Sequence, residues 1–138
     1  MTRAVYRRSD KQQPGGARPD FTRLLGQWRN LDDATQGLLQ LTLCSDGELH
    51  TLHVLGADRD ETADWGQVGA SFYVAEGTTQ ALGFHAKFTR NGLNTYIAAN
   101  LNKGIYVVQT YTSGVNNGPG IFSKEYFRRC ASSAGDND

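Results

Sequence analysis

The sequence contains three histidines, His50, His53 and His85, and these are the first residues to consider for metal or acid–base chemistry. They lie in segments where apolar residues alternate with polar ones, which is typical of β-strands. His50 and His53 are three residues apart, so they point to opposite faces of a strand and do not form a joint metal site. His85 is out of phase with Phe84 and Phe88, so we expect it on the outside of the protein.

His53 is the best candidate for an inward polar side chain if Leu49, Thr51 and Leu55 share its face. The alternative interpretation, for all three histidines, is that they are ordinary strand residues without a chemical role. We therefore keep His53 as a candidate catalytic residue and predict no metal site.

Glu125 is the second residue that could take part in acid–base chemistry. It lies in the last alternating segment, where either choice of inner face places a polar or charged residue inside. If Glu125 faces the interior, it is a candidate general acid or base. If Lys124 faces the interior instead, Glu125 is a surface carboxylate. The alternation leaves both orientations open.

Two loops resemble ligand sites only in composition. Residues 58–64 are acidic, but they lack the Gly and the closing Glu that an EF-hand calcium loop has at fixed positions. We interpret residues 56–63 as a solvated loop. Residues 114–120 are rich in glycine but lack the Lys and Ser/Thr of a phosphate loop, so we expect a flexible rim. No Ser-His-Asp order, Cys-His pair or zinc spacing is visible, and we predict no metal and no cofactor.

The interior of the protein is predicted to be hollow. Aromatic residues are plentiful in the second half of the chain and would serve equally as a packed core or as the walls of a pocket. Polar residues on the expected inner faces favour a pocket, because an unpaired buried polar group costs about 1–3 kcal/mol in a solid core. The residues that we predict to line a ligand cavity are Trp28, Leu41, His53, Phe72, Phe84, Phe88, Ile97, Gln109, Tyr111 and Glu125.

Eight short strands are expected to position these residues. Most are joined by tight turns, of which Arg90-Asn91-Gly92 and Asn102-Lys103-Gly104 are strong hairpin signals. No segment of ten or more residues has a helical period. The predicted strands are residues 26–30, 38–44, 48–55, 65–75, 80–89, 93–101, 105–112 and 121–129.

Consecutive hairpins favour an all-β fold, an eight-stranded antiparallel up-and-down β-barrel. Closure leaves no exposed strand edge and encloses room for about one small ligand. An open sandwich of two four-stranded sheets is the alternative. Residues 20–25 are predicted to form a short helical turn with Asp20 as its N-cap. We expect a single domain over residues 21–130, with disordered tails at residues 1–20 and 131–138.

The two cysteines, Cys44 and Cys130, are predicted to be free thiols. In a closed barrel they lie at the ends of the two strands that flank the first strand. At about 4.8 Å per strand spacing, their backbones would be about 9–10 Å apart. A disulfide requires less than about 7 Å between the Cα atoms.

The length and the net charge of the chain indicate which classes of binding partner to expect. The chain has 138 residues, the size of one domain, and its 14 Lys and Arg balance 14 Asp and Glu. Nothing therefore favours binding to nucleic acid or to an anionic membrane. Residues 1–8 carry positive charge, but no apolar segment follows them as in a signal peptide. We expect a cytoplasmic monomer or homodimer whose partner is a small molecule.

Gly26, Trp28 and the basic pair Arg128-Arg129 resemble features of the calycin barrels, which include lipocalins, fatty-acid-binding proteins and avidins. In those families a Trp at the start of the first strand closes one end of the barrel and packs against a basic residue of the last strand. The resemblance covers residues 21–129. It implies that Arg128 or Arg129 contacts Trp28, and that the ligand is a hydrophobic or amphiphilic small molecule.

A second resemblance is to small bacterial proteins that have Trp-x-Asn at the start and Asp-Trp-Gly after the third strand. The matching residues here are Trp28, Asn30 and Asp64-Trp65-Gly66. In that group a pair of cysteines brackets the loop before Asp-Trp-Gly, whereas this chain has Asp58 and Ala63. The resemblance implies a bacterial origin but no particular activity.

Three functions remain open at this point. The first is a ligand-binding barrel that carries, sequesters or senses an apolar or amphiphilic small molecule. The second is a small barrel-type enzyme, similar to cyclases or isomerases of natural-product pathways, with Glu125 or His53 as its acid or base. The third is a packed structural barrel without a ligand. An inward Glu125 or His53 without a charged partner would favour the enzyme.

Overall fold

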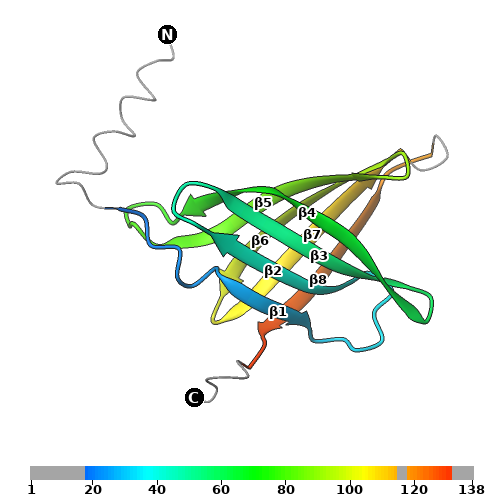
Figure 1. The fold of residues 1–138 in the computed structure, drawn as a ribbon, viewed down its shortest axis with the longest axis horizontal. Coiled ribbons are helices and arrows are strands. Elements are labelled where there is room, and N and C mark those ends of the chain that lie inside the picture. The colour runs from blue at the N-terminus through cyan, green and yellow to red at the C-terminus, as the bar shows by residue number, and fades with distance from the viewer. Residues whose placement is uncertain (1–17, 115–117, 132–138) are drawn as a thin grey trace, which may run out of the picture.

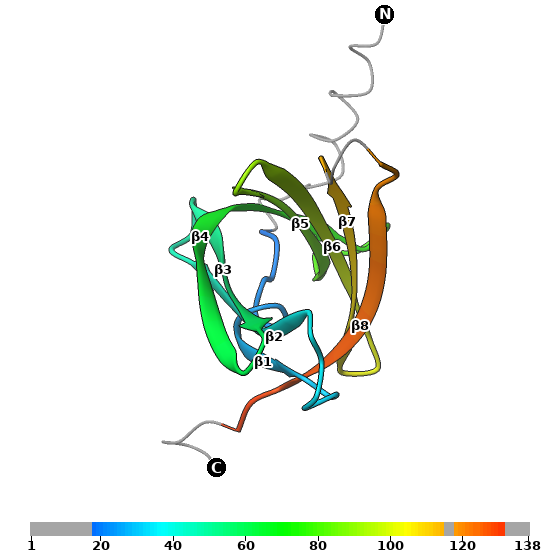
Figure 2. The same ribbon diagram turned by 90° about the vertical axis from the view of Figure 1, so that its right-hand side faces the viewer.

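The computed structural model describes residues 18–114 and 118–131, which form one closed barrel of eight antiparallel strands in chain order (Figures 1 and 2). This confirms the predicted up-and-down barrel and excludes the open sandwich. Of the tails predicted at residues 1–20 and 131–138, residues 1–17 and 132–138 lie outside the described residues. The strands are β1 (Gly26–Asn30), β2 (Leu38–Ser45), β3 (His50–Asp58), β4 (Glu61–Val74), β5 (Ala81–Arg90), β6 (Leu93–Asn102), β7 (Ile105–Ser113) and β8 (Ile121–Arg129).

The barrel closes between its first and last strands. Trp28 of β1 is the register partner of Leu41 of β2 on one side and of Arg129 of β8 on the other. Because β1 is paired on both sides, the sheet has no free edge at this point. The strands therefore enclose the interior on all sides. The sizes of the side chains that point inward determine how much of this interior is filled.

Tight turns join most neighbouring strands, as their sequences predict. Asn91 and Lys103 have positive φ angles of 52° and 55°, and each is followed by a glycine that also has a positive φ. Two consecutive residues with positive φ form the hairpin turn that matches the twist of antiparallel strands. The same turn type explains why Asn-Gly and Lys-Gly stand at these positions.

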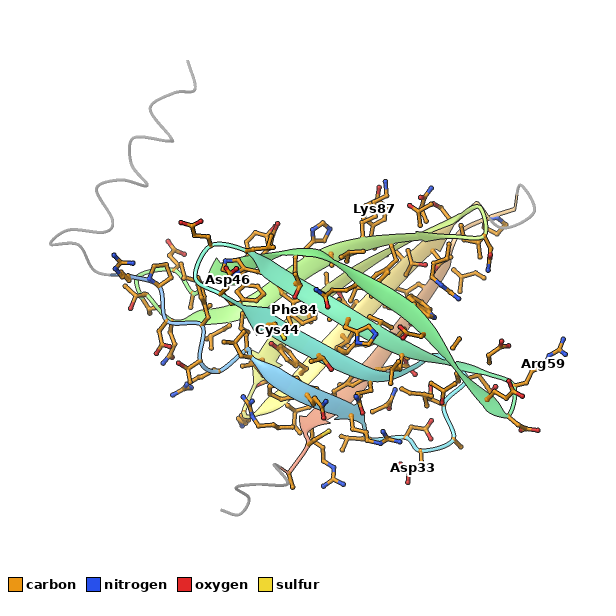
Figure 3. All side chains as sticks on the ribbon, viewed as in Figure 1. Asp33, Cys44, Asp46, Arg59, Phe84 and Lys87 are labelled. Atoms are coloured by element: carbon orange, nitrogen blue, oxygen red, sulfur yellow. The ribbon has the colours of Figure 1, made fainter. Side chains whose placement is uncertain are left out.

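The predicted loop at residues 56–63 is wrong. β3 and β4 continue through this segment, with Ala57 opposite Thr62 and Asp58 opposite Glu61. Only Arg59 and Asp60 form the turn, and Arg59 has a φ of 62°. The physical reason is that the acidic residues stand at the exposed tip of a hairpin, where a continuous strand pair has the same polar sequence as a solvated loop. Figure 3 shows Arg59 projecting from the tip of this hairpin.

One end of the barrel is densely packed. The rings of Trp28 and Tyr106 have centroids 4.2 Å apart, and the ring of Phe84 meets Tyr106 edge-on at 5.3 Å. Phe84 points into the barrel, whereas Lys87 of the same strand points outward (Figure 3). Leu41 and Phe127 are the register partners of Trp28 and Tyr106, and both are fully buried in the same core, as is Val108.

The segment before β1 covers the packed end. Its single turn is closed by the Leu24 N–H, which donates to the Phe21 carbonyl at 2.9 Å, and Asp20 accepts from the Thr22 N–H at 3.0 Å. The predicted helical turn is therefore one hydrogen-bonded turn, because the described residues contain no helix. None of the described residues belongs to a helix that could span a membrane.

Leu24 anchors this turn inside the barrel. Its side chain is fully buried, and its carbonyl accepts hydrogen bonds from Trp28 Nε1 at 3.1 Å and from the Tyr106 hydroxyl at 3.0 Å. Burial raises the pKa of Tyr106 far above its usual range, so the hydroxyl remains protonated and available as a donor. Two aromatic side chains of the core thus hold the covering turn in place.

Arg129 completes the packed end from the last strand. Its guanidinium lies over the Trp28 ring, 4.4 Å from the ring centroid, and donates to the carbonyls of Leu25 and of Arg23, the latter at 2.8 Å. Arg129 is thus the basic residue that packs against Trp28. Arg128 points away from the interior and is exposed.

Both cysteines are free thiols, as the strand order predicts. Cys44 lies in β2, opposite Thr51 of β3, and the Cys130 N–H donates to the Gln27 carbonyl of β1. β1 therefore separates the two thiols, which is the physical reason that no bridge forms between them.

Replacing Arg129 with alanine is expected to lower the free energy of unfolding by about 1–2 kcal/mol, because a cation–π contact and two charge-assisted hydrogen bonds are lost at an exposed site. Arg128→Ala is the matched control, with an expected change below about 0.5 kcal/mol. Urea unfolding followed by tryptophan fluorescence measures both. Equal losses in the two variants would contradict the role of Arg129 at the packed end.

Candidate functional site

A cavity of about 400 Å³ lies at the end of the barrel opposite the covering turn. Its walls come from the segment before β2, the β3–β4 hairpin, the end of β5 and the inner faces of β6, β7 and β8. The side chains that matter most for its chemistry belong to Leu38, Trp65, Arg90, Thr95, Ser123 and Glu125.

The cavity exists because β4 and β5 diverge at this end. β4 is in register with β3 from Glu61 to Gly69, but its register with β5 runs only from Ala70 to Val74. Figure 1 shows the β3–β4 and β5–β6 hairpins well apart at the right-hand side. The small inner residue Ala63 leaves this space unfilled.

Trp65 and Arg90 form the wall where the two strands diverge. The Trp65 ring meets Phe88 of β5 edge-on, with centroids 5.6 Å apart, and the Arg90 guanidinium lies 4.4 Å from the Trp65 ring centroid. Gly56 of β3 makes room for the indole, since a Cβ at this position would lie 2.6 Å from Trp65 Nε1. Neither Trp65 nor Arg90 is among the predicted site residues.

Glu125 faces the interior and lines the cavity, whereas Lys124 is exposed on the outside. Its carboxylate accepts hydrogen bonds from the Thr35 hydroxyl and from the Leu38 N–H, the latter at 3.2 Å. A Cβ on Gly37 would lie 2.8 Å from Glu125 Oε1, so only glycine fits beside the carboxylate without a shift. Glu125 thus anchors the segment that leads into β2.

Hydroxyl groups line the remaining wall. Thr95 and Thr112 share a hydrogen bond of 3.0 Å between β6 and β7, and Thr110 and Ser123 share one of 2.5 Å between β7 and β8. These pairs satisfy the polar groups without filling the cavity. They also leave lone pairs and protons within reach of a bound molecule.

The predicted cavity residues separate into two groups within the barrel. Glu125 lines the cavity at the open end. The others that point inward belong to the packed part or contact it, and their contact with a ligand stays a prediction. These are Trp28, Leu41, Phe72, Phe84, Phe88 and Ile97.

His53 lies on the outside of the barrel, so the prediction that it points inward is wrong. The inner residues of β3 are Leu52 and Val54, which are fully buried. His53 Nε2 is 2.7 Å from Asp64 Oδ1 on the outer face of β4. This hydrogen bond, followed by one from the Gly66 N–H, lowers the pKa of Asp64. His85 also lies outside, as expected, stacked beside Tyr96.

Gln109 and Tyr111 also lie on the outer face, so the prediction that they line the interior is wrong. The Tyr111 hydroxyl donates to Gln109 Oε1 at 3.1 Å, and Tyr111 is 47% exposed. The inner face of β7 carries Tyr106 and Val108 instead. Both faces of this strand bear aromatic and aliphatic residues, so alternation alone does not identify the inner one.

Comparison with protein-family models, with curated proteins and with solved structures found no match. Function must therefore be inferred from the geometry of the cavity. The described residues contain no group of three or more His, Cys, Asp or Glu that could hold a metal ion. What the cavity offers a ligand is an indole, a guanidinium, two carboxylates and several hydroxyls.

Replacing Glu125 with glutamine is expected to lower the free energy of unfolding by about 1–2 kcal/mol, because an amide accepts the hydrogen bonds of Thr35 and Leu38 more weakly than a carboxylate. Lys124→Gln is the control, because it removes one charge from the outer face of the same strand. It should change the free energy of unfolding by less than about 0.5 kcal/mol. Urea denaturation compares the two. If Glu125→Gln costs no more than Lys124→Gln, Glu125 is not the anchor of this segment.

Proposed function

We propose that the protein is a small-molecule-binding barrel that holds an amphiphilic ligand in the cavity at its open end. The observation that carries this proposal is the uneven filling of one closed interior. Large aromatic side chains fill the end beneath the covering turn, whereas a cavity of about 400 Å³ is left at the other. Ligand pockets in proteins have volumes of about 300–1,000 Å³.

The chemistry of the walls supports an amphiphilic ligand rather than a purely apolar one. Leu38, Trp65 and Ile121 supply apolar surface, while Glu125 and the threonine hydroxyls supply polar groups on the facing strands. A binding pocket typically combines apolar walls with a few placed polar groups that fix the orientation of the ligand. A barrel with a purely structural role has no need of such a combination.

The resemblance to calycin barrels supports the same proposal. Trp28 and Arg129 close one end, which leaves the other end as the entrance for a ligand. This support comes from a likeness in architecture, and architecture alone does not determine function. Carriage, sequestration and sensing all require the same binding step.

An enzyme is the second candidate, and the inward position of Glu125 favours it. No Lys, Arg or His nitrogen lies within 4 Å of this carboxylate in the described part of the chain, where His53 and Asp64 form the one ion pair. However, Thr35 and Leu38 already donate to both carboxylate oxygens. This arrangement suits a fixed acceptor better than a group that exchanges protons with a substrate, so binding remains the first proposal.

Filling the cavity with a larger side chain should weaken ligand binding. N-phenyl-1-naphthylamine, a neutral dye that fluoresces in apolar surroundings, is expected to bind the natural protein saturably with one dye per chain. Ala63→Phe places a ring in the cavity and should weaken binding at least about tenfold, a loss of about 1.4 kcal/mol, because the ring takes up volume that the dye requires.

Ala98→Phe is the matched control, because Ala98 lies on the outer face of β6 opposite Gln109. It should bind the dye like the natural protein. Fluorescence titration of the three proteins measures the affinities. The absence of saturable binding to the natural protein, or equal binding to Ala63→Phe, would contradict the proposed function.

A further inference from the structure

We propose that the ligand carries an anionic group that pairs with Arg90. This inference rests on the proposed binding function and specifies the chemical class of the ligand. Arg90 is the last residue of β5, is half-buried and lines the cavity. Its guanidinium is held against the Trp65 ring, 4.4 Å from the centroid.

The contact with the Trp65 ring holds the guanidinium without using its hydrogen-bond donors. Among the described residues, the arginine side chains that donate hydrogen bonds are those of Arg29 and Arg129, so the N–H groups of Arg90 are available. A planar guanidinium with free N–H groups matches the geometry of a carboxylate, sulfonate or phosphate. Trp65 thus holds Arg90 ready to bind an oxyanion.

The protein supplies no anion for Arg90 among the described residues. Two other charged side chains line the cavity, Asp58 and Glu125, and neither forms an ion pair with Arg90. Glu125 is held at β8 by Thr35 and Leu38, and Asp58 is exposed to solvent at the end of β3. A half-buried guanidinium is stabilised by an opposite charge, so a ligand anion is the missing partner.

The neighbouring wall fits the rest of such a ligand. Thr95, one strand away from Arg90, is hydrogen-bonded to Thr112, and this pair leaves one hydroxyl proton free to donate to an oxyanion. Trp65 and Leu38 provide apolar surface for the body of the molecule. The predicted class is therefore a small organic anion with an apolar portion, rather than a neutral lipid.

Two dyes that differ by one charged group test this inference. 8-Anilino-1-naphthalenesulfonate has the ring system of N-phenyl-1-naphthylamine and adds a sulfonate. We expect the natural protein to bind the sulfonate dye at least about fivefold more tightly than the neutral dye, because charge-assisted hydrogen bonds contribute to its binding alone. Each dye should displace the other, which shows that they share the cavity.

Arg90→Gln should weaken binding of the sulfonate dye about tenfold and change binding of the neutral dye by less than about twofold. Retained binding of the neutral dye also shows that this variant is folded. Arg90→Lys keeps the charge and should recover part of the lost affinity. Arg59→Gln removes a positive charge from the exposed tip of the β3–β4 hairpin (Figure 3) and should leave both affinities unchanged.

The outcomes separate the two proposals. If the neutral dye binds as tightly as the sulfonate dye, or Arg90→Gln weakens both equally, the anion inference is wrong and the binding function stands. If Arg90→Gln has no effect on the sulfonate dye, that dye binds elsewhere and the inference is wrong. If neither dye binds the natural protein, both proposals fail.

Discussion

The contact of Arg129 with Trp28 and the covering turn is the interaction on which the rest of the structure depends. It joins the last strand to the first and to the segment that covers one end of the barrel. Once the ring is closed there, the barrel has one covered end and one end left open. The large side chains Phe84 and Tyr106 occupy the covered end. The cavity at the other end follows from the divergence of β4 and β5 and from the small residues there.

The polar residues of the cavity differ in how many of their hydrogen-bonding groups are already used within the protein. The carboxylate of Glu125 accepts two hydrogen bonds from one short segment, so its main role is to hold that segment at the entrance. The threonine hydroxyls are paired across neighbouring strands. Arg90 is held by a ring instead, which leaves its N–H groups available. Because these N–H groups are available, Arg90 is the residue that we expect to pair with an anionic ligand.

The sequence predicts the strands and turns well because these depend on local chemistry. Glycine after Asn91 permits the positive φ that a tight hairpin requires, and the strand order follows from consecutive hairpins. The orientation of β3 and β7 is harder to predict, since apolar residues occur on both faces and only the closed barrel decides which face is inside. His53 and Tyr111 were misplaced for this reason. The pair of Trp65 and Arg90 could not be predicted, because it depends on where two strands separate.

The most direct test of a hollow, ligand-binding open end is a two-dimensional ¹H–¹⁵N NMR titration of the natural protein with 8-anilino-1-naphthalenesulfonate. If the ligand binds in the cavity, the backbone resonances of Gly37, Thr95 and Ser123, which line it, will shift saturably. Leu24, buried at the covered end, should remain unchanged. Shifts confined to the exposed aromatic residues Tyr111 and Phe122 on the outer face, or no saturable shifts at all, would contradict binding in the cavity.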